Sequence, residues 1–236
     1  MARESEFRFK QFSVLNHKTA MKVGTDSILL GAWCEVSEAK CVLDVGTGCG
    51  LIALMVAQRN DHCNIDGIDI DEDAIEEARF NFSQSPWSDR LKAFMDDFNH
   101  HIFENKYDLI VSNPPFFTDG IVSPHEKRRK ARHMTELSIE QLIVKSVSLL
   151  SDSGRLCFIT PANIEDYVMK CCSSTSVFIS KKVAVSTKID AIPKRYLWEI
   201  SKKSTVAISS NISIYNEDNN YTDQFANLCK DFYLKI

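Results

Sequence analysis

The chain has 236 residues, of which 44% are hydrophobic and 25% are charged, and its formal net charge is -4 at pH 7. These values are typical of a single globular domain and give no overall signal for nucleic-acid binding. No apolar run reaches the roughly 18 residues of a membrane span. The N-terminus also lacks the apolar core of a signal peptide. We therefore expect a cytoplasmic protein without a membrane partner.

Eight cysteines are present, and none of them form a C-x-x-C pair. Zinc knuckles and thioredoxin-type redox sites depend on such spacing. Several of the cysteines lie in apolar segments, where a thiol behaves as a small hydrophobic side chain. We therefore expect reduced cysteines and no metal site.

Strand and helix patterns alternate through the middle of the chain. The expected strands are 41–45, 64–70, 91–94, 107–112 and 155–160. The expected helices are 51–58, 71–82 and 138–150, with Asp71 and Ser138 as N-caps. This alternation predicts a parallel sheet that is covered by helices on both faces.

The two ends of the chain have a different character. Residues 7–23 contain alternating aromatic positions that suggest a small hairpin or cap, and a helix is expected at 25–33. Further strands are expected at 177–179, 198–200 and 206–208, and a helix at 222–231. Because no linker separates these parts, we expect one domain with an N-terminal extension (1–36) and a core (37–236) that has an antiparallel C-terminal edge.

A glycine-rich turn follows the first core strand. Asp44 lies near the end of that strand, and Gly46, Gly48 and Gly50 come next in a G-x-G-x-G spacing. Glycines here permit a tight turn and let a ligand approach the backbone closely. A dinucleotide fingerprint needs a small residue at position 51, which is Leu51. The turn therefore fits a methyltransferase better than a nicotinamide oxidoreductase, although a turn that only serves packing has the same pattern.

Acidic residues follow the next two strands. Asp69 can accept hydrogen bonds from both ribose hydroxyls of an adenosine, at the expected distance from the glycine turn. Asp96 and Asp97 follow the third strand, and one of them can accept from the adenine amine with Phe98 against the ring. We favour Asp97, although either residue can be a solvated loop residue.

The fourth strand ends at Asn113-Pro114-Pro115-Phe116. A ring-conjugated amine is a poor nucleophile because its lone pair is delocalised. Two acceptors aimed at its hydrogens favour a pyramidal nitrogen, and the Asn113 side-chain oxygen and the Pro114 carbonyl form such a pair. Phe116 can stack on the base. A Pro-Pro turn without function is the simpler alternative, but the glycine turn and Asp69 converge on the same sheet edge.

These residues closely resemble the class I, Rossmann-like amino-methyltransferases with an N-P-P-(Y/F) motif. Both chain ends extend the resemblance to the bacterial valine-tRNA adenine-37 N6-methyltransferases. The segments that carry it are Phe9-Lys10-Gln11-Phe12, Lys22-Val23-Gly24-Thr25-Asp26, Ala131-Arg132-His133, Tyr221-Thr222 and Lys230-Asp231-Phe232-Tyr233-Leu234-Lys235. Phenylalanine replaces the commoner tyrosine of the motif, which keeps the stack but removes a hydroxyl contact.

The resemblance implies a mostly parallel seven-stranded sheet and methyl transfer from S-adenosylmethionine, with S-adenosylhomocysteine as the product. The acceptor is N6 of adenine 37 in a valine tRNA, recognised through the anticodon arm, and no stable protein partner is implied. The implied amine site is Asn113, Pro114, Pro115 and Phe116. The implied cofactor site is Thr25, Asp44, Gly46, Gly48, Gly50, Asp69, Asp97 and Asn113, and 22–26 closes over the cofactor or the base.

A dense basic segment follows the motif. It contains Lys127, Arg128, Arg129, Lys130 and Arg132. Such a cluster is usually a solvated surface, but beside a methylation motif it predicts contacts with tRNA phosphates. Three alternatives stay open: methylation of a release-factor glutamine, methylation of a ribosomal RNA guanine, and a non-catalytic RNA-binding protein that retains the cofactor site.

Overall fold

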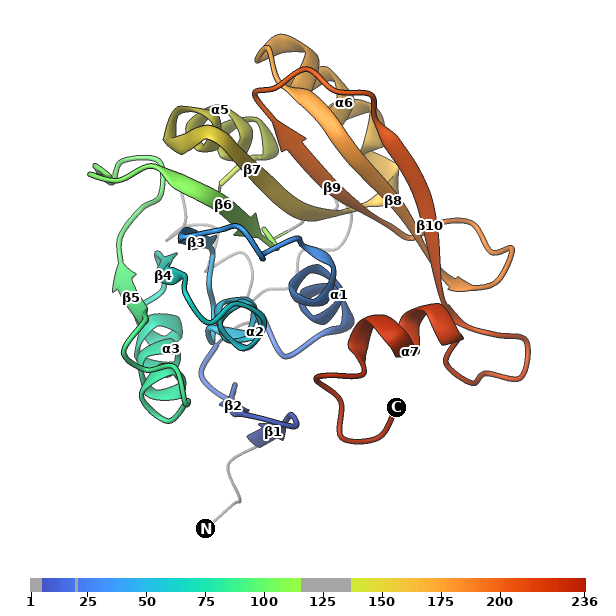
Figure 1. Ribbon diagram of the computed structural model, residues 1–236, viewed down its shortest axis with the longest axis horizontal. Helices are drawn as coiled ribbons and strands as arrows, with labels where there is room; N and C mark the ends of the chain where they lie inside the picture. Colours follow the sequence, from blue (N-terminus) through green and yellow to red (C-terminus); the bar gives the residue numbers. More distant parts are fainter. Residues whose placement is uncertain (1–5, 20, 116–136) are drawn as a thin grey trace, which may run out of the picture.

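A computed structural model describes residues 6–19, 21–115 and 137–236. One large sheet forms the centre of the molecule (Figure 1). Its strands are β3 (Cys41–Val45), β4 (Asn64–Asp69), β5 (Leu91–Met95), β6 (Tyr107–Ser112), β7 (Leu150–Pro161), β8 (Phe178–Lys188), β9 (Arg195–Ser201) and β10 (Ile208–Tyr215). The strand order is β10-β8-β9-β7-β6-β3-β4-β5.

The sheet is mostly parallel, as predicted. Only β9 runs against its neighbours β7 and β8, in the C-terminal part of the sheet. The sheet has eight strands rather than the seven implied by the resemblance. The eighth is β10, which pairs in parallel with β8. It satisfies the backbone groups that β8 would otherwise expose as an edge strand.

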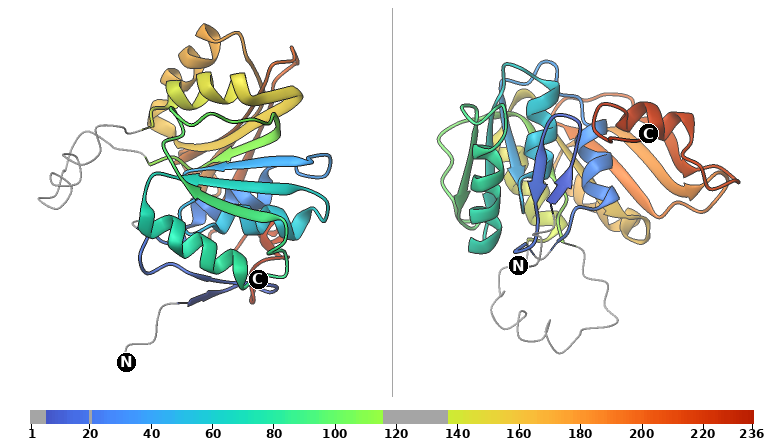
Figure 2. Two further views of the ribbon diagram at one scale, coloured as in Figure 1. Left: turned by 90° about the vertical axis from the view of Figure 1, so that its left-hand side faces the viewer. Right: turned by 90° about the horizontal axis from the view of Figure 1, so that it is seen from below.

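Helices cover both faces of the sheet (Figure 1). One face carries α1 (Thr25–Trp33), α2 (Leu51–Arg59), α3 (Glu72–Ser83) and α7 (Asp223–Cys229). The other face carries α5 (Ile139–Leu149) and α6 (Glu165–Ser174). The hairpin of β1 (Glu6–Arg8) and β2 (Ser13–Leu15) packs on the first face, as Figure 2 shows from two further sides. No helix in the described ranges is long and apolar enough to cross a bilayer.

The predicted helix caps are confirmed. The Asp71 carboxylate accepts from the backbone N–H of Asp73, 3.0 Å away, at the start of α3. Ser138 and Gln141 form a complete capping box at the start of α5. These bonds satisfy N–H groups that have no partner inside the helix.

Several elements differ from the sequence expectation, among them β10, which covers Ile208–Tyr215 where a strand was expected at 206–208. Strand β8 continues to Lys188 instead of ending at residue 179, and α6 was not anticipated. Lys181 and Lys182 interrupt the apolar pattern of β8, but each finds a carboxylate in the folded chain, Glu199 and Glu165 respectively. Because these partners are distant in the sequence, the local pattern of residues does not show that the two lysines can lie within a strand.

The N-terminal extension is tied to α3 by buried side chains. The Glu77 carboxylate accepts from the backbone N–H groups of His17, Lys18 and Thr19, at 2.7 to 3.1 Å. Asn81 bonds both to the backbone of Leu15 and to the carbonyl of Cys49. The extension is therefore attached directly to the glycine turn.

Gly50 has a packing role. Its φ is +83°, and a Cβ at this position would lie 2.4 Å from the Phe82 ring. Gly48 has a φ of +55°, but a Cβ there would meet nothing within 4 Å. An alanine at Gly48 would therefore introduce backbone strain alone, whereas an alanine at Gly50 would introduce both strain and a steric clash.

We predict that Gly50→Ala lowers the free energy of unfolding by about 2–4 kcal/mol, because strain and overpacking add. Gly48→Ala should cost about 1 kcal/mol, from strain alone. Urea unfolding of both variants measures the difference. Equal losses would show that Phe82 moves aside at no cost, and Phe82→Leu should recover part of the Gly50→Ala loss.

Candidate active site

The predicted site residues meet at one edge of the sheet. Asp69 ends β4, while Gly46, Asp97 and Asn113 follow β3, β5 and β6. These strands are parallel neighbours, so their carboxyl ends lie side by side. Hydrogen bonds connect the ends: Gly46 N donates to the Ile68 carbonyl at 2.9 Å. The edge is therefore one continuous surface, as ligand sites of open α/β sheets are.

The glycine turn forms an open cradle. Gly46 and Gly48 have φ of +69° and +55°, values that favour glycine. A Cβ at either position would meet nothing within 4 Å. Gly48 N donates to Asp69 Oδ2 at 2.9 Å, which holds the turn against β4. A ligand can thus approach the backbone of the turn closely.

Asp44 is a fully buried carboxyl beneath this turn. Its Oδ2 accepts from Thr47 Oγ1 at 2.8 Å and from Ala53 N at 3.2 Å. Its Oδ1 is buried and has no hydrogen-bond partner within the described part of the chain. Burial raises the pKa of the Asp44 carboxyl to about 7. An unpaired buried carboxyl oxygen is costly, and a ligand ammonium group would satisfy it.

Asp69 faces the cradle from the neighbouring strand. Its two oxygens accept from the backbone N–H groups of Gly48 and Asp71. Desolvation raises the pKa of Asp69, and the two backbone hydrogen bonds oppose that shift. A carboxylate oxygen has two lone pairs, so Asp69 retains capacity for ribose hydroxyls.

The two acids after β5 both pair with histidines. Asp97 accepts from Asn99 N at 2.9 Å and lies 2.7 Å from His100 Nδ1. Asp96 lies 2.7 Å from His101 Nδ1 and is the more exposed, at 48% against 18% for Asp97. Phe98 is buried in the core cluster that lies on the α5 and α6 face, and its place against an adenine ring stays a prediction.

The Asn113 side chain is buried and oriented. Its Nδ2 donates to Ser27 Oγ at 2.9 Å and lies 3.5 Å from Met21 Sδ. A thioether can only accept, so this pair favours the amide nitrogen on that side and leaves Oδ1 for another donor. No local pattern pointed to Ser27, because 86 positions separate it from Asn113.

The remaining residues of the predicted site lie partly within and partly outside the described ranges. Pro114 is buried and Pro115 is exposed, while Phe116 lies outside the described residues. Thr25 is the first residue of α1 and lines a hollow that also contains Asn113. The basic residues Lys127, Arg128, Arg129, Lys130 and Arg132 also lie outside the described ranges. All eight cysteines are unpaired, and the described ranges hold no cluster of three or more His, Cys, Asp or Glu side chains suited to a metal.

Comparison with known proteins identifies the family. The family model described as "Methyltransferase small domain" matches residues 17–170. A curated relative from Haemophilus influenzae, named tRNA1(Val) (adenine(37)-N6)-methyltransferase, is 41% identical and covers 98% of this chain and 100% of its own. Relatives of the same name from Phocaeicola vulgatus and Trichodesmium erythraeum are 39% and 41% identical, each covering 98% of both chains. The chain belongs to this family of S-adenosylmethionine-dependent methyltransferases.

Solved structures support the fold assignment. A predicted O-methyltransferase from Agrobacterium tumefaciens has a TM-score of 0.69 at 14% identity and covers 88% of this chain and 96% of its own. A ribosomal protein L11 methylase from Lactobacillus delbrueckii has a TM-score of 0.55 at 16% identity and covers 84% of this chain and all of its own. At these identities the likeness concerns the class I methyltransferase fold alone.

The state of Asp44 generates a pH prediction. A cofactor ammonium requires the charged carboxylate, and Asp44 loses its proton only near pH 7. The affinity for S-adenosylmethionine should therefore rise about fivefold to tenfold from about pH 6 to about pH 7.5. Isothermal titration calorimetry measures this rise.

Asp44→Asn should flatten the pH dependence and weaken binding. Asp61→Asn serves as the control, since Asp61 is exposed and follows the far end of α2, the helix that begins at the turn. An equal pH slope in Asp44→Asn and in the unaltered protein would assign the titration to another group.

Proposed function

We propose that the protein methylates N6 of adenine 37 in a valine tRNA. The observation that carries this proposal is the oriented amide of Asn113 at the sheet edge, next to the glycine cradle. The names and near-complete coverage of the curated relatives support the tRNA substrate. The features of the cradle that fit S-adenosylmethionine are the unpaired Asp44 oxygen, the open space at Gly46 and Gly48, and the Asp69 carboxylate.

The chemistry falls to a few groups of this chain. When bound, S-adenosylmethionine supplies an electrophilic sulfonium methyl group and leaves as S-adenosylhomocysteine. Asn113 Oδ1 and the Pro114 carbonyl accept the two hydrogens of the adenine amine and favour its pyramidal form. After the nitrogen gains the methyl group, it releases one proton to water. Burial of Asn113 and Pro114 keeps competing water away from these acceptors.

A release-factor glutamine and a ribosomal RNA guanine offer a similar planar amine. The N-P-P-F motif does not separate these substrates from adenine. The curated tRNA relatives cover nearly the whole of this chain, whereas the general methyltransferase model matches residues 17–170, and this wider likeness favours tRNA. A base in a tRNA loop also costs less free energy to unstack than a base in a duplex.

We predict that the purified protein transfers labelled methyl from S-adenosylmethionine to unmodified valine tRNA. The same tRNA with guanine in place of adenine 37 should stay unlabelled. Digestion to nucleosides should show N6-methyladenosine. Robust labelling of a release factor or ribosomal RNA, with none in tRNA, would refute the tRNA assignment.

The Asn113→Ala variant should lower kcat about 100- to 1,000-fold, as loss of one preorganised polar group does in other enzymes. Its affinity for S-adenosylmethionine should change less than about threefold, since the cradle residues are intact. Asn105→Ala is the matched control, because Asn105 is exposed on the loop before β6. Full activity in Asn113→Ala would show that the amide does not act on the amine.

A further inference from the structure

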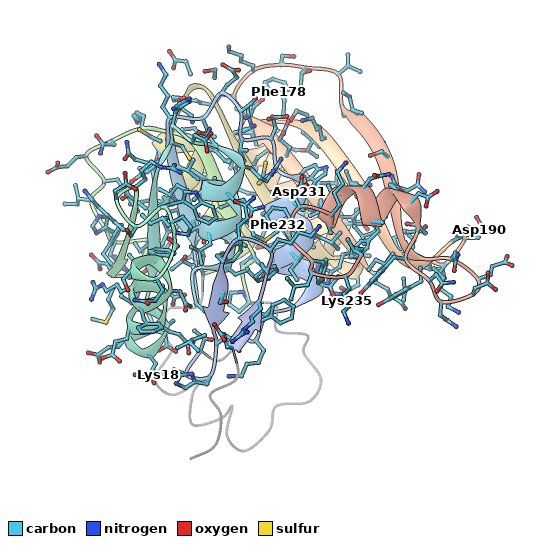
Figure 3. All side chains as sticks on the ribbon, turned by 60° about the horizontal axis from the view of Figure 1, so that its bottom comes forward. Lys18, Phe178, Asp190, Asp231, Phe232 and Lys235 are labelled. Carbon is cyan, nitrogen blue, oxygen red and sulfur yellow. The ribbon has the colours of Figure 1, made fainter. Side chains whose placement is uncertain are left out.

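A hollow of about 990 Å³ continues the sheet edge beyond Asn113. Its walls are the start of α1, residues 161–163 at the end of β7, and residues 192–196, which lead into β9 and include its first two residues. Pro161 pairs with Arg195 across β7 and β9, so both walls lie at the edge where Asn113 lies. The loop between β8 and β9 projects from the body, and Figure 3 shows Asp190 at its outer end. The cradle residues are not among those that line this hollow.

The lining has a positive charge balance. Lys22, Lys194 and Arg195 contribute three cations, and Asp26 contributes one carboxylate. Asp26 is occupied by Arg195, whose Nε lies 2.8 Å from Asp26 Oδ2. The ammonium group of Lys194 has no ion pair within the described ranges, and the residue is exposed. A local excess of two positive charges on a chain of net charge -4 favours an anionic ligand.

The remaining wall is apolar and preorganised. Ile192 is 80% exposed at the rim, beside Pro193. Tyr196 also lines the hollow, and its ring is held by Lys182, 4.5 Å from the ring centroid, and by the Trp198 ring at 5.5 Å. Rigid apolar and aromatic surfaces beside cations are the usual components of single-stranded nucleic-acid sites.

The hollow is larger than a single amino group requires. Pockets of 300–1,000 Å³ enclose ligands with several rings, and the hollow reaches about 990 Å³. Asn113 lines the hollow from β6, while most of the lining comes from the start of α1 and from residues at β7 and β9. Among the described residues, the hollow therefore has room for a neighbouring nucleotide of the same strand beside the target amine.

We propose that this hollow binds a nucleotide adjacent to the target adenine. Its base lies against Ile192, Pro193 and Tyr196, and its phosphate lies at Lys194 and Arg195. The inference rests on the proposed function, because it assumes that the amine at Asn113 belongs to an RNA strand. It adds a second RNA subsite that is built by the β8–β9 loop and α1.

Two matched double variants test the subsite. Ile192→Ser with Lys194→Gln alters the rim of the hollow. Val206→Ser with Lys203→Gln makes similar changes in the β9–β10 connection, at the opposite end of β9, where Val206 is 88% exposed. Both pairs lie on the surface, so thermal unfolding should be unchanged in each.

Fluorescence anisotropy measures binding of an unmodified valine anticodon stem-loop RNA, with S-adenosylhomocysteine present, over a range of salt concentrations. The rim variant should raise Kd about tenfold and reduce the slope of log Kd against log salt by about 0.7 for each phosphate that it no longer binds. The control variant should stay within about twofold. Equal effects of the two variants, or an unchanged slope in the rim variant, would overturn the subsite.

Altered RNAs identify which neighbouring base is bound. Two stem-loops are compared with the intact one: the first has an abasic nucleotide directly before the target adenine, and the second has one directly after it. One of the two should bind the unaltered protein about tenfold more weakly than the intact stem-loop does. The rim variant should lose much less at that position, because the base and the rim interact. Equal losses in both proteins would overturn the proposal. These binding measurements need no methyl transfer, so failure of tRNA methylation overturns the proposed function separately.

Discussion

The left-handed glycine turn after β3 is the constraint on which the rest of the site depends. Gly46 and Gly48 take a backbone conformation that favours glycine, and they leave open space where side chains would otherwise stand. The same turn donates to the Ile68 carbonyl and to Asp69, so it holds the end of β4 in place. Asp96 N in turn donates to the Asp69 carbonyl at 3.1 Å. One local conformation thus organises the ends of three strands into a single binding edge.

Strand β6 divides that edge into two chemically different halves. The ends of β3, β4 and β5 on one side present carboxylates and open backbone, which suit the ribose hydroxyls and the ammonium group of S-adenosylmethionine. The end of β7 and the start of β9 on the other side form the hollow with its excess of cations. Asn113 stands between the halves, where the proposed reaction brings the methyl donor and the amine together. The parallel strands bring their carboxyl ends to this edge, and the antiparallel β9 brings its first residue, Arg195, beside the end of β7.

The N-terminal extension belongs to the site rather than lying beside it. Glu77 and Asn81 attach it to α3 and to the glycine turn. It also contains α1, whose first turn supplies Ser27 to the Asn113 amide and Asp26 to Arg195. One helix start therefore supports both the amine site and the wall of the hollow. Loss of the extension would remove support on both sides of β6 at once.

The sequence alone determined the features that depend on local chemistry. The buried core strands, the caps at Asp71 and Ser138, and the glycine turn all follow from residue type and spacing, and they placed Asp69 and Asn113 at one edge. The tertiary structure decided what depends on distant partners: the length of β8, through Lys181 and Glu199, and the orientation of Asn113, through Ser27. It also decided that Gly50 faces Phe82 and that Asp44 keeps an unpaired oxygen. Such interactions join residues far apart in the chain, and no local pattern encodes a pairing whose benefit appears only after the chain has folded.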